Sequence, residues 1–200
     1  MLKLDIAELK RPIQTLPENA ACGDKTFVLE NENYVLLALI DGAGHGPIAS
    51  RASDAAVDFL IEQPIEQDLC ETLSALHEEL RNSRGAVADL CRIDKRTGVV
   101  SYSGIGNVTS RIFKPEGDVS FFPRNGMLGY EILPPKAHQK QINPGEVLIL
   151  YSDGVRSQLN RDEFPAFFEL SAYDIARITI DYFSKTLDDA SCIVVKVADD

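Results

Sequence analysis

The segment Asp41-Gly42-Ala43-Gly44-His45-Gly46 brings a carboxylate, a glycine-rich turn and a histidine together directly after the apolar run 34–40. A run this rich in Leu, Val and Ile is typical of a strand buried on both faces, which would fix the position of Asp41. The glycines remove side chains from the turn, so backbone groups can approach an ion or a phosphate closely. The alternative is an ordinary strand-to-helix turn in which Asp41 caps a helix that begins near Pro47.

Three further acidic positions lie at the edges of apolar, strand-like runs. Asp24 precedes the run 25–30, Asp153 follows the run 147–151, and the pair Asp188-Asp189 precedes the run 190–197. Each position alone is also consistent with a turn residue or a solvated strand end. Carboxylates that converge repel one another unless a cation offsets the repulsion, and oxygen ligands suit magnesium or manganese. The recurring placement therefore favours a metal centre.

The elements that must position these acids are short strands and a few amphipathic helices. Strands are expected at 27–30, 34–40, 87–93, 99–103, 108–113, 119–122, 147–151 and 192–197, and helices at 48–63, 65–80, 163–170 and 172–187. Turn-forming residues, for example at 94–98, favour antiparallel hairpins between the strands. Helices grouped around runs of strands predict an α+β sandwich rather than alternating βαβ units.

Composition limits the remaining possibilities. The 200 residues predict a single domain over 1–200, with 44% hydrophobic and 26% charged residues. The net charge of −11 argues against nucleic acid as a partner. The segment 1–11 alternates apolar and charged residues and does not match a signal peptide, and no apolar run of about eighteen residues is present, so we expect a cytoplasmic protein without a membrane partner. The scattered cysteines at 22, 70, 91 and 192 predict neither a zinc site nor disulfides.

The acidic motifs occur in an order that resembles a known family. Cys22-Gly23-Asp24, the Asp41 to Gly46 segment, Ser152-Asp153-Gly154 and Asp188-Asp189-Ala190-Ser191 are similar to the motifs of the metal-dependent PPM serine/threonine phosphatases, the protein phosphatase 2C superfamily. Within that superfamily the chain most resembles the SpoIIE-type branch, and the segments 104–108 and 124–129 resemble the small RsbX-type phosphatases of stressosome operons. The resemblance implies a four-layer αββα sandwich of two antiparallel sheets flanked by helix pairs, with no separate sensor domain.

The resemblance also implies a centre that holds Mn²⁺ or Mg²⁺, with two ions. The metal ligands it implies are Asp24, Asp41, Gly42, Asp153, Asp188 and Asp189. Asp41 would bridge the ions and Gly42 would offer its carbonyl, whereas Asp189 matches a position that is often Asn or Asp and is given a supporting role. Asp41 and Asp153 are the catalytic residues on this pattern, since a bridging water would attack phosphorus in line.

The histidines and arginines match the family pattern less well. His45 has a side chain suited to a general acid, but the family's histidine follows the DG directly and Ala43 stands there in this chain, so His45 is expected to shape the turn or the helix start. His77 and His138 lack metal-like spacing and are expected on the surface. The family's phosphate-binding arginine has no clear counterpart, with Arg11 as the nearest candidate.

Three functions compete at this point. The first is a metal-dependent phosphatase that acts on phosphoserine or phosphothreonine of phosphorylated STAS-domain stressosome proteins of the RsbR and RsbS kind. The second is a catalytically silent PPM-fold module that binds a partner in the same kind of pathway, which loss of the metal acids would favour; none is lost here. The third is an unrelated metal hydrolase of small phosphate esters.

Overall fold

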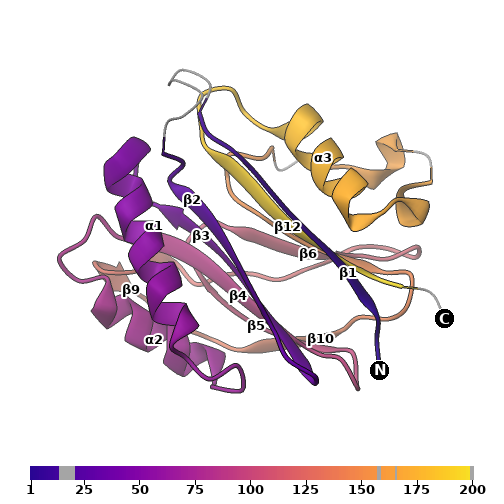
Figure 1. Cartoon of the computed structure of the whole chain (residues 1–200), viewed down its shortest axis with the longest axis horizontal. Helices are drawn as coiled ribbons and strands as arrows, with labels where there is room; N and C mark the ends of the chain where they lie inside the picture. Colours follow the sequence, from indigo (N-terminus) through magenta and orange to yellow (C-terminus); the bar gives the residue numbers. More distant parts are fainter. Residues whose placement is uncertain (14–20, 157–158, 165, 199–200) are drawn as a thin grey trace.

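The computed structural model describes residues 1–13, 21–156, 159–164 and 166–198, and its strands form two five-stranded antiparallel sheets with helices on both outer faces (Figure 1). The first sheet has the order β1-β12-β11-β6-β7, from β1 (Leu4–Arg11), β6 (Thr109–Phe113), β7 (Val119–Ser120), β11 (Val147–Tyr151) and β12 (Ala190–Val197). The second has the order β10-β5-β4-β3-β2, from β2 (Asp24–Glu30), β3 (Tyr34–Gly42), β4 (Ala86–Asp94), β5 (Val99–Ile105) and β10 (His138–Gln141). A small hairpin joins β8 (Gly126–Met127) and β9 (Glu131–Ile132).

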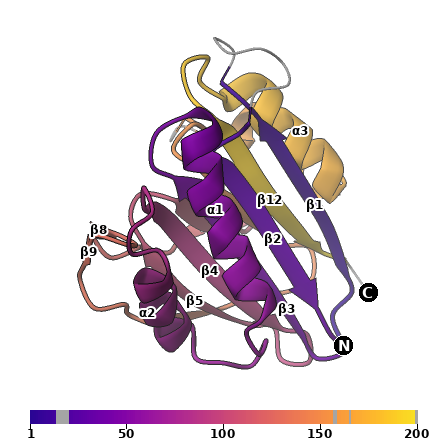
Figure 2. The same cartoon turned by 60° about the vertical axis from the view of Figure 1, so that its left-hand side comes forward.

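Three apolar cores separate four layers. Alternate residues of the central strands face opposite sides: in β3, Leu37 and Leu39 pack between the two sheets, whereas Ala38 and Ile40 pack against α1 (Gly46–Ile61) and α2 (Leu69–Glu79). The outer face of the first sheet is covered by α3 (Ala172–Phe183). Figure 2 shows α1 and α2 over β2 to β5, and β1 beside β12 near α3. The predicted αββα sandwich of two antiparallel sheets is confirmed.

The helical layers differ from the expectation in detail. The segment 65–80 was expected to be helical throughout, but α2 begins only at Leu69 because the Asp68 side chain caps it by accepting from the amides of Cys70 and Glu71. The expected helix at 163–170 is wrong: two 3₁₀ turns, Arg161–Glu163 and Phe167–Glu169, occupy the described part of this region. The outer face of the first sheet therefore carries one α-helix, α3, and short turns rather than a pair of long helices.

One strand, at the N-terminus, was not among those expected, and the expectation for one histidine is wrong. The alternating segment at the N-terminus is a strand, β1, which pairs with β12 over its whole length. His77 is not a surface residue: it is 7% exposed, and its Nδ1 accepts from the Gly129 amide. Among the described residues, the helices are too short or too polar to cross a membrane.

Candidate metal centre

The second sheet contributes two carboxylates that face each other. Asp24 is the first residue of β2 and Asp41 is the penultimate residue of β3, and the antiparallel register places them directly opposite one another. Like charges in directly opposed positions of two strands destabilise a sheet. Asp24 is 1% exposed, so water screens this repulsion poorly. The pair is therefore a costly arrangement that a bound cation would relieve.

The first sheet contributes Asp153 and Asp188 at the same end of the sandwich. Asp153 lies two residues after β11 and Asp188 two residues before β12, and these two strands are antiparallel neighbours. Their ends are joined beyond the sheet, because the Ser152 amide donates to the Ser191 carbonyl (3.1 Å) and the Ser191 amide donates to Ser152 Oγ (3.0 Å). The serines thus hold the two acidic segments side by side.

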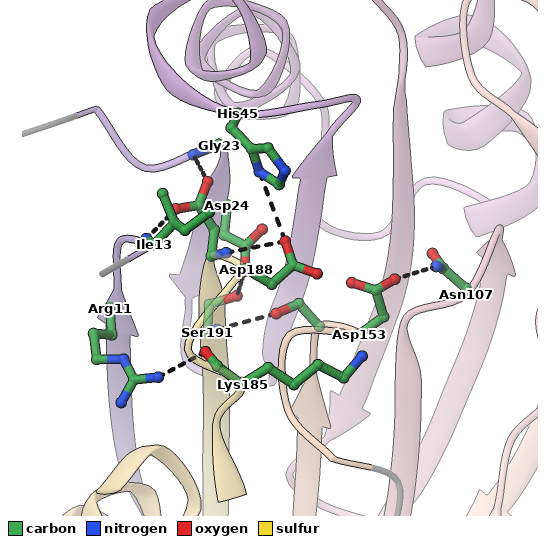
Figure 3. A network of polar contacts seen from close by, with 12 residues as sticks. Arg11, Ile13, Gly23, Asp24, His45, Asn107, Asp153, Lys185, Asp188 and Ser191 are labelled. Carbon is green, nitrogen blue, oxygen red and sulfur yellow. Dashed lines mark hydrogen bonds and ion pairs between the residues drawn. The ribbon is translucent and has the colours of Figure 1, made fainter. Parts of the chain in front are cut away.

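Hydrogen bonds connect the two sheets at this end (Figure 3). Ser191 Oγ on β12 donates to Asp24 Oδ2 on β2 across 2.7 Å. The Asp189 carboxylate is 3% exposed and accepts from the amides of Ile13 and Gly23, each at 2.7 Å. Both Asp189 oxygens therefore have backbone partners, and this side chain joins three separate chain segments.

A pocket of about 280 Å³ opens between these segments. Its lining consists of Asp41, Ala43, Gly44, His45, Val87, Asn107, Met127, Asp153 and Asp188. The fold thus brings three of the predicted carboxylates to one pocket, with Asp24 opposite Asp41 behind them. Asp189 and Gly42 do not line it. A Cβ at Gly42 would lie 2.3 Å from the Ala49 carbonyl oxygen, so this glycine allows α1 to begin close against β3.

Burial and the charges of neighbouring acids raise the pKa values of three of these acids. Burial, with the charges of Asp24, Asp153 and Asp188, raises the pKa of Asp41 to about 9. Burial raises the pKa of Asp24 to about 6, although hydrogen bonds from Ser152 and Ser191 oppose the rise. Burial and the nearby Asp153 also raise the pKa of Asp188, against the opposing effect of His45. Such a set of oxygen donors fits a divalent cation such as Mg²⁺ or Mn²⁺.

Some of the acids in the pocket also have polar neighbours of their own. Asn107 Nδ2 donates to Asp153 Oδ2 (2.7 Å), and His45 Nδ1 lies 3.7 Å from Asp188 Oδ1. Within the described ranges, no three His, Cys, Asp or Glu side chains are grouped closely enough to hold a metal ion as they stand. The donor chemistry therefore fits a metal, but the side chains would have to turn toward it.

The turn after β3 excludes the simplest alternative for Asp41. The N-cap of α1 is His45, whose side chain makes no capping hydrogen bond, and a proline occupies the first helical turn as expected. Asp41 is not a helix cap. His45 stands at the helix start, as expected, and also lines the pocket beside Asp188.

Sequence reasoning missed several residues of this site. Ser191 and Asn107 each lie in a quoted motif, but neither was given a role; Ser191 orients Asp24 and Asn107 orients Asp153. Ser152 binds the Ser191 backbone from the other strand. A hydrogen-bonding residue close in sequence to a predicted metal ligand is the pattern that could have identified Ser152 and Ser191. Asn107 is far from all of these acids in the sequence, so this pattern does not identify it. Arg11 does not line the pocket; its Nη2 donates to the Lys185 carbonyl at 2.9 Å.

Several proteins of known structure share this architecture. A chain from a structure of the bacterial stressosome, described as a modular system adapted to control secondary messenger signalling, superposes with a TM-score of 0.87 at 30% identity, covering 97% of this chain and all of that one. RsbX in complex with magnesium gives a TM-score of 0.80 at 20% identity, over 99% of this chain and all of RsbX. The PP2C phosphatase domain of SpoIIE from Bacillus subtilis gives 0.80 at 16% identity, over 98% of this chain and 62% of that one.

The two packed sheets, with helices on their outer faces, have the fold of PP2C-type phosphatase domains. The model of the family described as Stage II sporulation protein E (SpoIIE) matches residues 31–197, and the chain belongs to this family. Phosphoserine phosphatase RsbX of Bacillus subtilis (strain 168) is 28% identical over 149 residues, which cover 71% of this chain and 74% of RsbX.

Proposed function

We propose that this protein is a metal-dependent phosphoprotein phosphatase that hydrolyses phosphoserine or phosphothreonine on STAS-domain proteins of a bacterial stressosome, in the cytoplasm. The observation that carries the proposal is the meeting of Asp41, Asp153 and Asp188 at one pocket, in a chain of the SpoIIE family. Acids crowded at such a site are destabilising, which is the expected cost of a prebuilt cation site. The similarity to RsbX, which is a phosphoserine phosphatase, and to a stressosome chain supports the substrate class.

In this proposal Asp41, Asp153, Asp188, Asp24 and the Gly42 carbonyl hold two Mn²⁺ or Mg²⁺ ions. Bound there, the ions would supply Lewis-acid chemistry: they would lower the pKa of a water nucleophile and offset negative charge on the phosphoryl oxygens. The magnesium complex of RsbX supports the choice of ion.

The remaining residues of the site orient the ligands. Asn107 and Ser191 direct the carboxylates of Asp153 and Asp24, and Asp189 holds the segments through the amides of Ile13 and Gly23. Asp189 is thus a positioning residue rather than a direct ligand.

The test is phosphate release from a phosphorylated STAS-domain protein, with Mn²⁺ or with a chelator, beside p-nitrophenyl phosphate. We expect release that requires the metal, and a loss of about a hundredfold or more in Asp41→Asn and in Asp153→Asn. Asp58→Asn, on the exposed face of α1, is the matched control and should retain activity. Mn²⁺ should also raise the Tm of the wild type but not of the two site variants. Metal-independent release, or full activity in both variants, would refute the two-metal proposal.

A catalytically silent binding module is the second candidate. It is favoured by one observation: within the described residues, no three metal-binding side chains form a shell as they stand. It predicts binding to the phosphorylated partner without phosphate release and without a Tm rise in Mn²⁺. Release from the small ester but not from the protein would instead favour a hydrolase of small phosphate esters.

A further inference from the structure

A second pocket adjoins the candidate metal centre. It has a volume of about 380 Å³, and its lining consists of Asn107, Thr109, Tyr151, Asp153, Val155, Arg156 and Lys185. Asp153 and Asn107 line both pockets, so the two pockets lie next to each other. A substrate with its phosphate at the metal centre would therefore place its neighbouring residues in the second pocket.

Two exposed cations distinguish the second pocket. Lys185 and Arg156 both line it, although the chain as a whole carries a net charge of −11. Among the residues that the structure describes, neither forms an ion pair. Figure 3 shows the Lys185 side chain extending toward Asp153. Two positive charges thus lie beside the site, where a ligand can reach them.

Backbone hydrogen bonds fix the positions from which these cations project. The Lys185 amide donates to the Gly154 carbonyl (2.7 Å), and the Lys185 carbonyl accepts from Arg11 Nη2 (2.9 Å). The Arg156 amide donates to the Phe183 carbonyl (2.8 Å). The segment after β11 is therefore paired with the segment after α3, and the two cations extend from a rigid frame.

We propose that this pocket binds an acidic side chain of the phosphoprotein, an aspartate or glutamate next to the phosphoserine. This inference rests on the proposed function and names the sequence that the site selects. The two cations have no ion-pair partner among the described residues and so offer charge complementarity, and the buried residues Tyr151 and Val155 form a wall that limits screening by water. A partner acidic near its phosphoserine would otherwise be repelled by this acidic protein, so the local cations also orient its approach.

The test compares two phosphoserine peptides that differ only by glutamate or glutamine next to the phosphoserine, with glutamate placed on either side in turn. The measured quantity is the ratio of kcat/KM for the glutamate and glutamine peptides, with Mn²⁺ present. The wild type should prefer one glutamate peptide by about fivefold, and added salt should reduce this ratio. In the double variant Lys185→Gln, Arg156→Gln the ratio should fall to about one.

The matched control is the double variant Arg96→Gln, Lys140→Gln, which removes two exposed cations at the opposite end of the second sheet. It should keep the wild-type ratio. A wild-type ratio near one on both sides, with phosphate released, would overturn this inference but not the proposed function. In the double variant Lys185→Gln, Arg156→Gln, both peptides could instead be slowed equally while the ratio stays at the wild-type value. That result would mean that the cations bind the transferred phosphoryl group, and it would also overturn this inference. If the wild type released no phosphate from any peptide or protein, the proposed function would fail, and this inference with it.

Discussion

Asp41 has a more strongly raised pKa than Asp24, the acid that faces it. It faces Asp24 directly across two strands and shares its pocket with Asp153 and Asp188. In the metal-free protein this carboxyl retains its proton at neutral pH, because burial and the three acids raise its pKa to about 9. Asp41, the proposed bridging ligand, is thus an acid whose ionised form is strongly disfavoured in the metal-free protein.

Replacing Asp41 with asparagine should stabilise the metal-free protein. At pH 7 the folded wild type keeps the Asp41 proton while the unfolded chain ionises, which favours unfolding. The neutral amide lacks this difference between the two states, so in chelator we expect a gain of about 2 kcal/mol, or about 4–8 °C in Tm for a chain of this size. Thermal unfolding of Asp41→Asn and of the exposed control Asp58→Asn provides the measurement. A Tm below that of the wild type would show that the crowded acids do not destabilise the fold.

The same variant has a predictable pH dependence. The folded pKa of Asp41 lies above the ordinary value of 3.8, so below about pH 4 the residue is protonated in both states and contributes no difference. As the pH rises from about 4 to about 9, the unfolded chain ionises first and the wild type loses stability. The advantage of Asp41→Asn should therefore be small at pH 4 and grow toward pH 9, measured as urea midpoints in chelator. A constant advantage would contradict this assignment.

At the level of single residues, the sequence predicted the acids better than their partners. Four acids could be predicted because each lies at the edge of an apolar run and within a motif: Asp24, Asp41, Asp153 and Asp188. The cations of the second pocket could not, since Lys185 lies in no recognised motif. Its position depends on pairing between segments far apart in the chain, which no local pattern encodes.

At the level of elements, the loop after β11 packs closely against the segment that precedes β12. A Cβ at Gly154 would lie 1.7 Å from the Asp189 carbonyl oxygen, which belongs to backbone and cannot move aside by a side-chain rotation. The same loop carries Asp153, and the segment it touches carries Asp188. Close packing of these two backbones therefore sets the separation of two proposed metal ligands.

Gly154→Ala should separate these segments. We expect a loss of about 1–3 kcal/mol in stability from overpacking, and loss of the Tm rise that Mn²⁺ gives the wild type. Gly117→Ala is the control: its added Cβ meets no atom within 4 Å, and it adds only the backbone strain of a residue with φ of +143°. The control should retain the metal-dependent Tm rise. An equal metal response in both variants would disprove the role of this contact.

The elements that the sequence failed to predict have physical explanations. Strand β10 is polar along its length and lies at a sheet edge, so it has no apolar periodicity to reveal it. In the segment 163–170 the phenylalanines have helical spacing, but Pro165 has no amide hydrogen and disfavours helical geometry in the residue before it. Phe164 is accordingly extended, with φ of −120° and ψ of 96°.

At the scale of the whole molecule, one buried carboxyl joins the two sheets. Asp89 on β4 is fully buried and accepts from Tyr102 Oη on β5 (2.9 Å) and from Ser110 Oγ on β6 of the other sheet (2.7 Å). Burial raises the pKa of Asp89 to about 7, against the lowering effect of these two hydrogen bonds. The interior of the sandwich thus contains a titratable link between its halves.

Asp89→Asn should remove a pH-dependent loss of stability. Between about pH 4 and pH 7 the unfolded wild type ionises while the folded Asp89 keeps its proton, so stability falls with rising pH and levels off above about 7. Relative to the wild type, Asp89→Asn should gain about 4 kcal/mol over this interval, because asparagine does not ionise in the unfolded chain. Its amide can still hydrogen-bond the two hydroxyls, since a hydroxyl can also accept. Urea unfolding in chelator, with Asp58→Asn as control, measures the difference. A difference that does not change with pH would refute it.

The pairing of β1 with β12, together with the hydrogen bonds from Ile13 and Gly23 to Asp189, has a consequence for synthesis of the protein. During translation, Asp24 and Asp41 leave the ribosome long before Asp153 and Asp188, and the segments that hold them together are completed only with the last strand. The pocket lined by Asp41, Asp153 and Asp188 cannot assemble gradually as the chain emerges. On the proposed function, a nascent chain would therefore release no phosphate until β12 is free to pair with β1.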